Sequence, residues 1–343
     1  MENESRVPTD ELRAALGQAL ERRFGAPRRI RKLRRRVSAY ASSCAIENID
    51  VALERGGRLN LVFKDLSPGA RLKTADHVRP SFLYRPAREI EVYQRRLGRH
   101  RSGTATFYGA VVDEPRQRYW LFLERVRGRL LWQFGRLGVW ESAARWLRRW
   151  HSLNEGMCLT PPRSMAGLLQ YDAAFYRLWP ERAVEHLRRN PAMGDRDGRR
   201  AFARMAERYE RVVRSLCDLP RTLIHGECYP SNVIVRAGGA RERICPIDWE
   251  LAAVGPGAMD LAALTAGEWT ETQRSSMIAA YRGAGLRREG GAWTVEDLVE
   301  AVDCCQLHQA VQMLGWAPNW TPPAPHAKNW LREALRLAKR LGV

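Results

Sequence analysis

The strongest signal in the chain is the segment LIHGECYPSNVIV, Leu223–Val235. It begins with apolar residues typical of a short strand, and a second apolar strand starts at Val233. Between the two strands stand a carboxylate, Glu227, and, after four further residues, an amide, Asn232. The order of strand, polar loop and strand therefore places a carboxylate and an amide on one short loop.

A carboxylate and an amide at this spacing suit the transfer of a phosphoryl group to a hydroxyl. The carboxylate accepts or orients the proton of the attacking hydroxyl, and the amide oxygen helps to hold the Mg²⁺ that neutralises the phosphates. His225 lies between apolar residues and Gly226. We expect His225 to brace the loop through hydrogen bonds rather than to act as an acid or a base.

A second apolar segment, ICPIDWE (Ile244–Glu250), also ends in carboxylates. Asp248 and Glu250 alternate along the chain, so on an extended backbone both side chains point to the same side and can approach one ion. Oxygen ligands of this kind suit Mg²⁺. The alternative is a strand that ends in solvated acids, and the order of the two segments favours the metal site.

The motifs HGECYPSN, IDWE and GPGAMDLA together resemble the catalytic and metal-binding signature of the aminoglycoside phosphotransferase/choline kinase family, a branch of the protein-kinase-like fold. The spacing from Glu227 to Asn232 equals that of the kinase catalytic loop, Asp-x-x-x-x-Asn. The resemblance implies that Glu227 is the catalytic base and that Asn232 and Asp248 are catalytic residues that bind Mg²⁺. It also implies that Glu250 is a further metal ligand and that Asp260 is an acid that stabilises the loop.

The family usually has Asp at the position of Glu227, so the carboxylate here lies one methylene further from the backbone. Phosphoryl transfer depends on the positioning of the reacting groups. A longer side chain therefore slows or reshapes the reaction, or suits a differently placed acceptor. A kinase-like nucleotide-binding module that has lost turnover is the alternative function.

The hydrophobic pattern predicts a small β-rich N-terminal lobe and a larger, mainly helical C-terminal lobe. Leucines at four-residue spacing indicate a first helix, and alternation on both sides of Gly56-Gly57 indicates a hairpin within residues 38–64. Further elements are predicted as a helix at 85–97, a strand at 119–126, short strands at 223–224, 233–235 and 244–247, and a final helix after residue 326. With the resemblance, this predicts an α+β, protein-kinase-like fold with a nucleotide-binding lobe at 1–125 and a catalytic and substrate lobe at 126–343.

In the N-terminal lobe, Lys64 ends the apolar strand LNLVFK and resembles the lysine that holds the α- and β-phosphates of ATP in this fold. The resemblance places the acid that pairs with this lysine on the following helix, at Glu89. Glu91 is the alternative, and only one of the two can face the lysine because they lie on different faces of a helix.

The chain contains neither a Walker loop nor a Gly-rich kinase loop. The best substitute is Tyr40-Ala41-Ser42-Ser43, where Ser42 and Ser43 would donate to the phosphates; an ordinary turn is the alternative. The segment LERVRG resembles the hinge between kinase lobes, which implies that backbone groups of Glu124 and Val126 bind adenine.

The acceptor leaves a weaker trace in the sequence. His308, Gln309 and Trp316 lie in the C-terminal helical region, where this family builds its acceptor pocket, and we take them as candidate substrate residues. Core packing is the alternative for each aromatic residue.

The balance of charge favours anionic ligands, because 57 Lys and Arg against 38 Asp and Glu give a formal net charge of +19. The most basic run, Arg28–Arg36, has seven basic residues in nine and no interleaved aromatic residues for base stacking. We interpret this run as a solvated connector and regard nucleic acid as an improbable partner. A polycationic acceptor is mildly disfavoured as well.

No apolar run approaches the roughly 18 to 20 residues of a membrane span, and the polar, acidic N-terminus differs from a secretory signal. A cytoplasmic location is therefore expected. The function expected from all these features is an ATP- and Mg²⁺-dependent phosphotransferase. Its acceptor would be a hydroxyl of a small molecule: a sugar, an amino alcohol or a natural-product intermediate.

Overall fold

The computed structural model describes residues 7–38, 43–72, 80–98, 103–155, 167–236, 243–284, 293–316 and 329–343. The chain divides into two units, residues 1–128 with 245–250, and residues 129–244 with 251–343. The division follows Gly128 rather than residue 125, and the segment that carries Asp248 and Glu250 belongs to the first unit.

An antiparallel sheet forms the framework of the first unit. Its strands are β1 (Ile30–Val37), β2 (Ala45–Leu53), β3 (Arg58–Asp65), β4 (Phe107–Asp113) and β5 (Arg118–Glu124), in the order β1-β2-β3-β5-β4. The predicted hairpin is confirmed as β2 and β3, in which Ile49 pairs with Leu61. The predicted strand at 119–126 is confirmed as β5.

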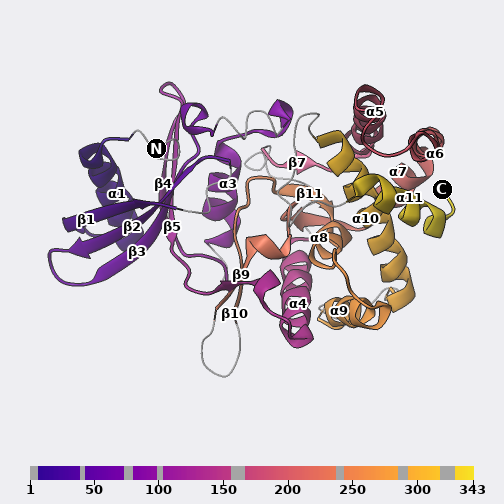
Figure 1. Ribbon diagram of the computed structural model, residues 1–343. Coiled ribbons are helices and arrows are strands. Elements are labelled where there is room, and N and C mark those ends of the chain that lie inside the picture. The colour runs from indigo at the N-terminus through magenta and orange to yellow at the C-terminus, as the bar shows by residue number, and fades with distance from the viewer. Residues whose placement is uncertain are drawn as a thin grey trace. The chain divides into compact units, whose positions relative to one another are not determined.

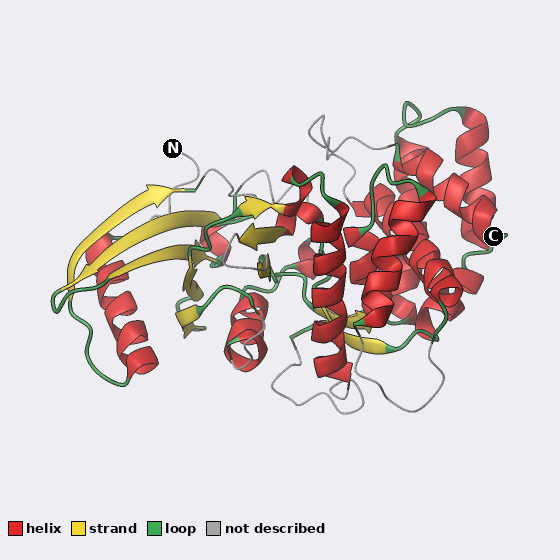
Figure 2. Cartoon of the chain, turned by 90° about the horizontal axis from the view of Figure 1, so that it is seen from below, coloured by secondary structure: helices red, strands yellow, loops and turns green. Residues whose placement is uncertain are grey.

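Helix α1 (Thr9–Phe24) lies along one face of this sheet (Figure 2). Its residues Leu12, Leu16 and Leu20 are fully buried and form one cluster with Phe63 and Phe122 of the sheet. The spacing of four residues brings these leucines to one side of the helix. The opposite face of the sheet therefore stays available for the side chains at even-numbered positions of β3, including Lys64.

The basic run at Arg28–Arg36 is not a connector, because most of it forms strand β1 at the edge of the sheet. A register shift between Ile30 and Lys32 lets Ile30 and Leu33 pack against the same core, although three residues separate them. This shift removes the strict alternation by which a strand is recognised. Exposed basic side chains on an edge strand also discourage pairing with another chain.

Helix α3 (Ala87–Val92) continues as a π-helical turn, η3 (Tyr93–Leu97), so the helix predicted at 85–97 is confirmed. Arg88, Glu89 and Ile90 are buried. The buried charges at positions 88 and 89 require partners, because an isolated ion is costly away from water.

The second unit is mainly helical (Figure 1). Its helices are α4 (Leu137–Asn154), α5 (Ala173–Arg189), α6 (Arg196–Glu207), α7 (Glu210–Cys217), α8 (Gly257–Leu264), α9 (Glu271–Gly283), α10 (Val295–Trp316) and α11 (Trp330–Leu341). Its short strands form two sheets, one of β10 (Arg243–Pro246), whose last two residues belong to the first unit, with β9 (Val233–Arg236) and β6 (Arg129–Leu130), the other of β7 (Leu169–Gln170), β11 (Ala253–Pro256) and β8 (Arg221–Ile224). The predicted strands at 223–224, 233–235 and 244–247 are confirmed as β8, β9 and β10.

Helix α10 is buried on nearly every side, since it packs against α5, α7, α8, α9 and α11. A helix in this position carries apolar or satisfied polar residues all round rather than one apolar stripe. None of the helices in the described part of the chain is both long enough and apolar enough to cross a membrane.

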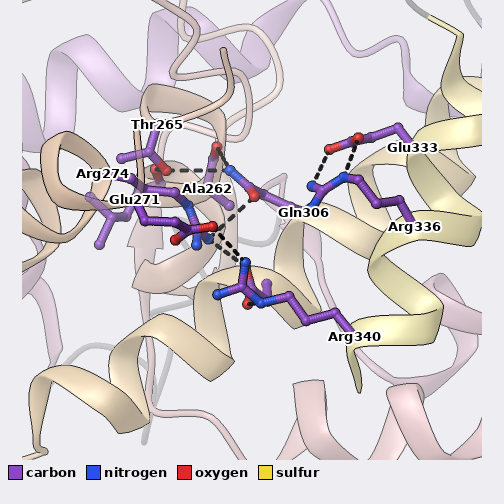
Figure 3. Close-up of polar contacts among 10 residues, drawn as sticks. Ala262, Thr265, Glu271, Arg274, Gln306, Glu333, Arg336 and Arg340 are labelled. Atoms are coloured by element: carbon purple, nitrogen blue, oxygen red, sulfur yellow. Dashed lines mark hydrogen bonds and ion pairs between the residues drawn. The ribbon is translucent and has the colours of Figure 1, made fainter. Parts of the chain in front are cut away.

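A polar network joins three of these helices (Figure 3). Asp303 of α10 accepts from Arg274 Nη2 of α9 at 2.6 Å and pairs with Arg340 Nε of α11 at 2.8 Å. The side chains of Asp303 and Arg274 are only 4% and 10% exposed. Water therefore screens this ion pair little, and each charge depends on the other.

We expect Asp303→Asn to lower the free energy of unfolding by about 2 kcal/mol, because the amide keeps one acceptor but loses the charge that two arginines share. Chemical denaturation measures this loss. Glu333→Gln is the control, since Glu333 pairs with Arg336 on the exposed surface of α11, and it should change stability by less than about 0.5 kcal/mol. Equal effects of the two substitutions would contradict the assignment.

Candidate active site

In the first unit, Lys64 of β3 lies between two carboxylates. Its Nζ donates to both Glu89 oxygens at 2.9 and 2.8 Å and to Asp248 Oδ1 at 2.8 Å. Burial by itself lowers the pKa of Lys64, but the charges of Asp248 and Glu89 outweigh it and raise that pKa well above its ordinary value. Nζ is therefore an ammonium group shared by two acids.

The partner of Lys64 on the helix is Glu89 and not Glu91. Glu89 is 1% exposed and also accepts from the backbone N–H of Trp249 at 3.3 Å. Glu91 accepts instead from Arg85 Nη2 at 3.0 Å. The two acids point to different faces of α3, as helical spacing requires.

Asp248 and Glu250 both belong to the first unit, but they are not aligned by an extended backbone. Strand β10 ends at Pro246, and Asp248 has a φ of +67°, in the left-handed region. The prediction that alternation along a strand points both side chains one way was therefore wrong in its geometry. The Asp248 carboxylate reaches Lys64, whereas Glu250 accepts from Ser43 Oγ at 3.0 Å.

Ser43, the one residue of the segment expected to bind phosphates that the structure describes, lies two positions before the start of β2. Its hydroxyl donates to the Glu250 carboxylate, and Arg88 Nη1 donates to the Glu250 carbonyl at 2.6 Å. Arg88, which the sequence did not single out, thus ties α3 to the segment that carries Asp248. Ser42 lies outside the described residues.

The segment that resembles a hinge follows β5. The Glu124 N–H donates to Thr106 O at 2.8 Å, and the Glu124 carboxylate accepts from Thr106 Oγ1 at 2.7 Å. The Arg125 N–H donates to Asn60 O at 2.9 Å. Within the described part of the chain, no hydrogen bond of the Val126 N–H is found.

In the second unit, Asp260 of α8 holds the loop that follows β8. Its carboxylate accepts from the N–H groups of His225 at 2.7 Å and Gly226 at 3.0 Å. His225 is fully buried, and its Nδ1 accepts from the Glu227 N–H at 3.3 Å. The bracing roles expected of Asp260 and His225 are confirmed.

Gly226 allows the chain to turn sharply at this point. Its φ is +84°, and a Cβ there would lie 2.2 Å from the carbonyl oxygen of Leu251. No residue with a side chain can adopt this position without displacing the backbone beside it. The turn sends the chain away from the buried His225 and leaves Glu227 only partly buried.

Asn232 ends the short helix η7 (Pro230–Asn232), just before β9. Its Nδ2 donates to Glu227 O at 2.9 Å. A carbonyl only accepts, so the amide nitrogen makes this bond and the amide oxygen remains as an acceptor. One hydrogen bond therefore couples the backbone at Glu227 to the orientation of Asn232.

The three candidate substrate residues lie in the helical core of the second unit. His308 is fully buried and its Nδ1 meets the Tyr209 hydroxyl at 2.9 Å. Gln309 Nε2 donates to Met259 O at 2.9 Å, and Trp316 is stacked on Trp179 with ring centroids 5.6 Å apart. These contacts bury the three residues among the helices that enclose α10, and their assignment to an acceptor stays a prediction.

Burial lowers the pKa of His308 to about 3, and this shift predicts a pH dependence of stability. The unfolded chain takes up a proton on this residue below about pH 6.5, whereas the folded chain does not. Stability therefore falls as the pH drops through 6.5, by about 2 kcal/mol at pH 5. Denaturation at pH 7 and pH 5 should show a larger loss for the wild type than for His308→Gln, and equal losses would refute the assignment.

A cavity of about 590 Å³ in the second unit lies elsewhere, between α7, the first half of α10 and the end of α11. Its lining includes Val212, Asp297, Glu300 and Leu341 and none of the residues predicted for the site. Across the described residues, no three or more His, Cys, Asp or Glu side chains gather to hold a metal ion.

His151 of α4 is a residue of this region that the sequence did not reveal. Its Nε2 lies 3.1 Å from Asp260 Oδ2, and its Nδ1 lies 2.8 Å from the Tyr281 hydroxyl. A single histidine in an amphipathic helix belongs to no local motif, so no sequence signal marked it.

The sequence matches the model of the phosphotransferase enzyme family over residues 85–298. A comparison with curated proteins finds no match. Among solved structures, a microcompartment-associated aminopropanol kinase is 17% identical, with 90% of each chain covered and a TM-score of 0.55. The GDP complex of wild-type aminoglycoside 2'-phosphotransferase-IIIa is 14% identical, with 96% of this chain and 97% of that chain covered and a TM-score of 0.53.

Choline kinase from Cryptosporidium parvum Iowa II is 13% identical, with 90% of each chain covered and a TM-score of 0.53. At such identities these likenesses establish the fold alone. The predicted α+β, kinase-like fold is confirmed.

Proposed function

The chain belongs to the phosphotransferase enzyme family, and on that premise we propose that it transfers the γ-phosphoryl group of ATP to a hydroxyl of a small molecule. The observation that carries the proposal is the buried ammonium of Lys64, held by Glu89 and Asp248 at 2.8 to 2.9 Å. Two acids around one lysine supply both a fixed cation for phosphates and a carboxylate for their metal ion.

The first unit is assigned the binding of the nucleotide. Lys64 contacts the phosphates and Glu89 holds it in place, as the pair of lysine and glutamate does in protein kinases. Ser42 and Ser43 are assigned to the phosphates as hydroxyl donors. Backbone groups of Glu124 and Val126 are assigned to adenine; among the described residues the Val126 N–H has no hydrogen-bond acceptor, which supports this assignment.

The side chains present fit Mg²⁺ carried by a nucleotide. Such an ion takes one or two carboxylates from the protein and completes its shell with phosphate oxygens and water. Asp248 and Glu250 are assigned as carboxylate ligands, and Asn232 is assigned as an amide ligand because its oxygen remains an acceptor. When bound, Mg²⁺ neutralises charge on the phosphates.

The second unit is assigned the activation of the acceptor. Glu227 accepts the proton of the attacking hydroxyl as its oxygen approaches phosphorus, and it is presented by a loop whose two preceding amides are held by Asp260. A carboxylate that orients a hydroxyl acts mainly by holding it in the position for attack. The Glu227 loop suits this role because Asp260 holds the two amides before Glu227, and Asn232 donates to the Glu227 carbonyl.

The acceptor is assigned to the class of sugars, amino alcohols and natural-product intermediates that carry a free hydroxyl. Proteins of the same fold act on aminoglycosides, choline and aminopropanol, as their names state. The net charge of +19 disfavours a polycation within this class. ATP is a co-substrate of the cytoplasm, and we place the reaction there.

One observation favours a second candidate, a kinase-like module that binds nucleotide without turnover. The carboxylate of Glu227 lies one methylene further from the backbone than that of the aspartate usual in the family. Such a module binds nucleotide through the same residues of the first unit and releases no ADP with any acceptor.

Two measurements test the proposal. Calorimetric titration should show binding of ATP that depends on Mg²⁺, with GTP titrated in parallel. A panel of sugars, amino alcohols and aminoglycosides should then be screened by coupled detection of ADP. No binding at millimolar Mg²⁺ and nucleotide would end both candidates, whereas binding without ADP release from any acceptor would favour the module.

A further inference from the structure

A buried chain of polar groups runs through the second unit behind the Glu227 loop. It joins Tyr281 of α9, His151 of α4 and Asp260 of α8, which are 4%, 1% and 1% exposed. The Tyr281 hydroxyl lies 2.8 Å from His151 Nδ1, and His151 Nε2 lies 3.1 Å from Asp260 Oδ2. Three helices therefore meet through one imidazole ring.

Hydrogen-bonding capacity assigns the protons along this chain. A carboxylate only accepts, so His151 Nε2 carries a proton and donates it toward Asp260. Burial raises the pKa of Tyr281 well above its ordinary value, so its hydroxyl keeps its proton. In the neutral imidazole, Nδ1 accepts from that hydroxyl, and both ring nitrogens are used.

The first residue of α8 makes room for this arrangement. A Cβ at Gly257 would lie 2.7 Å from both His151 Nδ1 and the Tyr281 oxygen. The backbone at the start of the helix therefore touches the pair directly. In addition, the His151 carbonyl accepts from Thr222 Oγ1 of β8 at 2.8 Å, just upstream of the loop.

The other end of the chain of groups is the loop itself. Asp260 Oδ2 accepts from His151 Nε2 and also from the His225 N–H, while Oδ1 accepts from the Gly226 N–H. His151 thus fixes the rotation of the carboxylate that holds two consecutive amides. The next residue is Glu227, and it follows a glycine whose left-handed backbone needs to be held in place.

We infer that His151 is a positioning residue for Glu227, acting through Asp260. Its Nε2–H sets the orientation of the carboxylate, and the Tyr281 hydroxyl sets the orientation of the imidazole. The effect of His151 on turnover rests on the proposed function, but its effect on the loop does not.

Two substitutions separate this role from ordinary packing. The terminal amide nitrogen of His151→Gln can occupy the place of Nε2 and donate to Asp260. His151→Asn is shorter and reaches only the place of Nδ1, so it keeps a contact with Tyr281 and loses the one with Asp260.

Tyr281→Phe is a milder variant that removes a single hydroxyl. Tyr209→Phe is its matched control, because it removes an equally buried hydroxyl from His308, which does not touch Asp260.

Hydrogen–deuterium exchange of the full chain, without ligand, measures the protection of the His225 and Gly226 amides. We expect exchange to accelerate about tenfold in His151→Asn, about threefold in Tyr281→Phe, and less than twofold in His151→Gln and Tyr209→Phe. Equal acceleration in the Asn and Gln variants, acceleration in Tyr209→Phe, or no acceleration in any variant overturns the inference. If His151→Asn does not fold, the exchange rates of Tyr281→Phe and Tyr209→Phe are compared instead, and equal rates overturn the inference.

Release of ADP from MgATP, with water as acceptor, provides the second readout. For His151→Asn we expect kcat to fall about tenfold with the KM for ATP unchanged within twofold, and His151→Gln should restore kcat to within threefold of wild type. An unchanged kcat in His151→Asn overturns the positioning role. If the wild type releases no ADP with water or with any acceptor of the panel, while the exchange pattern is as expected, the enzymatic proposal fails and the contact with the loop stands.

Discussion

Glu227→Gln should lower kcat about 10³-fold while the affinity for MgATP changes less than threefold. The amide keeps the shape of the side chain but cannot accept a proton, and a general base contributes roughly 10² to 10⁴ in rate. The residues assigned to the nucleotide belong to the first unit, so its binding has no direct dependence on this carboxylate. Steady-state kinetics with an acceptor from the panel, and titration with MgATP, give the two quantities.

Glu227→Asp is the informative companion, because it restores the residue usual in the family. It keeps the carboxylate and withdraws it by one methylene. We expect its kcat to lie well above that of Glu227→Gln, since the chemistry is retained and only the position changes. The assignment of the base fails if Glu227→Gln retains more than a third of wild-type kcat.

Asp248→Asn should weaken the binding of MgATP about 100-fold, which corresponds to about 2.7 kcal/mol. The substitution removes a charge from the metal ligand, while Glu89 keeps its two hydrogen bonds from Lys64. Binding of ATP without Mg²⁺ should change much less, because that mode does not use the carboxylate. Titrations with and without Mg²⁺ separate the two effects.

Asp65→Asn is the matched control for this substitution. Asp65 is a buried aspartate of the first unit, one residue after Lys64, but successive side chains of a strand point to opposite faces. Its Oδ1 accepts from the Ser67 N–H at 3.2 Å, a bond that asparagine can keep. A similar loss of MgATP binding in both variants would show that Asp248 acts through the stability of the unit rather than as a ligand.

The elements best predicted from the sequence are those formed by neighbouring residues. The β2–β3 hairpin follows from alternation around Gly56-Gly57, and α1 follows from its spaced leucines. The resemblance placed the partner of Lys64 at Glu89, with Glu91 as the alternative, and helical spacing allowed only one of the two. Their positions along α3 could not decide between them, because that depends on which face of the helix turns toward β3.

The limits of the sequence predictions share a physical cause. Strand β1 was missed because a register shift breaks its alternation, a feature that only pairing with β2 produces. His308 and Trp316 were taken as candidate acceptor residues because the resemblance places the acceptor pocket in the C-terminal helical region. Whether α10 exposes them depends on how many helices surround it, and α10 is almost entirely enclosed.

Taken alone, the sequence determined which short segments carry the carboxylates and amides, because groups within one loop are held together by the chain itself. It did not determine which distant groups meet. Lys64 and Asp248 are 184 positions apart, and His151 and Asp260 are 109 positions apart. Such contacts form only when packing of whole elements repays the entropy of closing long loops. The tertiary structure therefore decided which carboxylates accept from Lys64 and which buried groups hold the loop that carries Glu227.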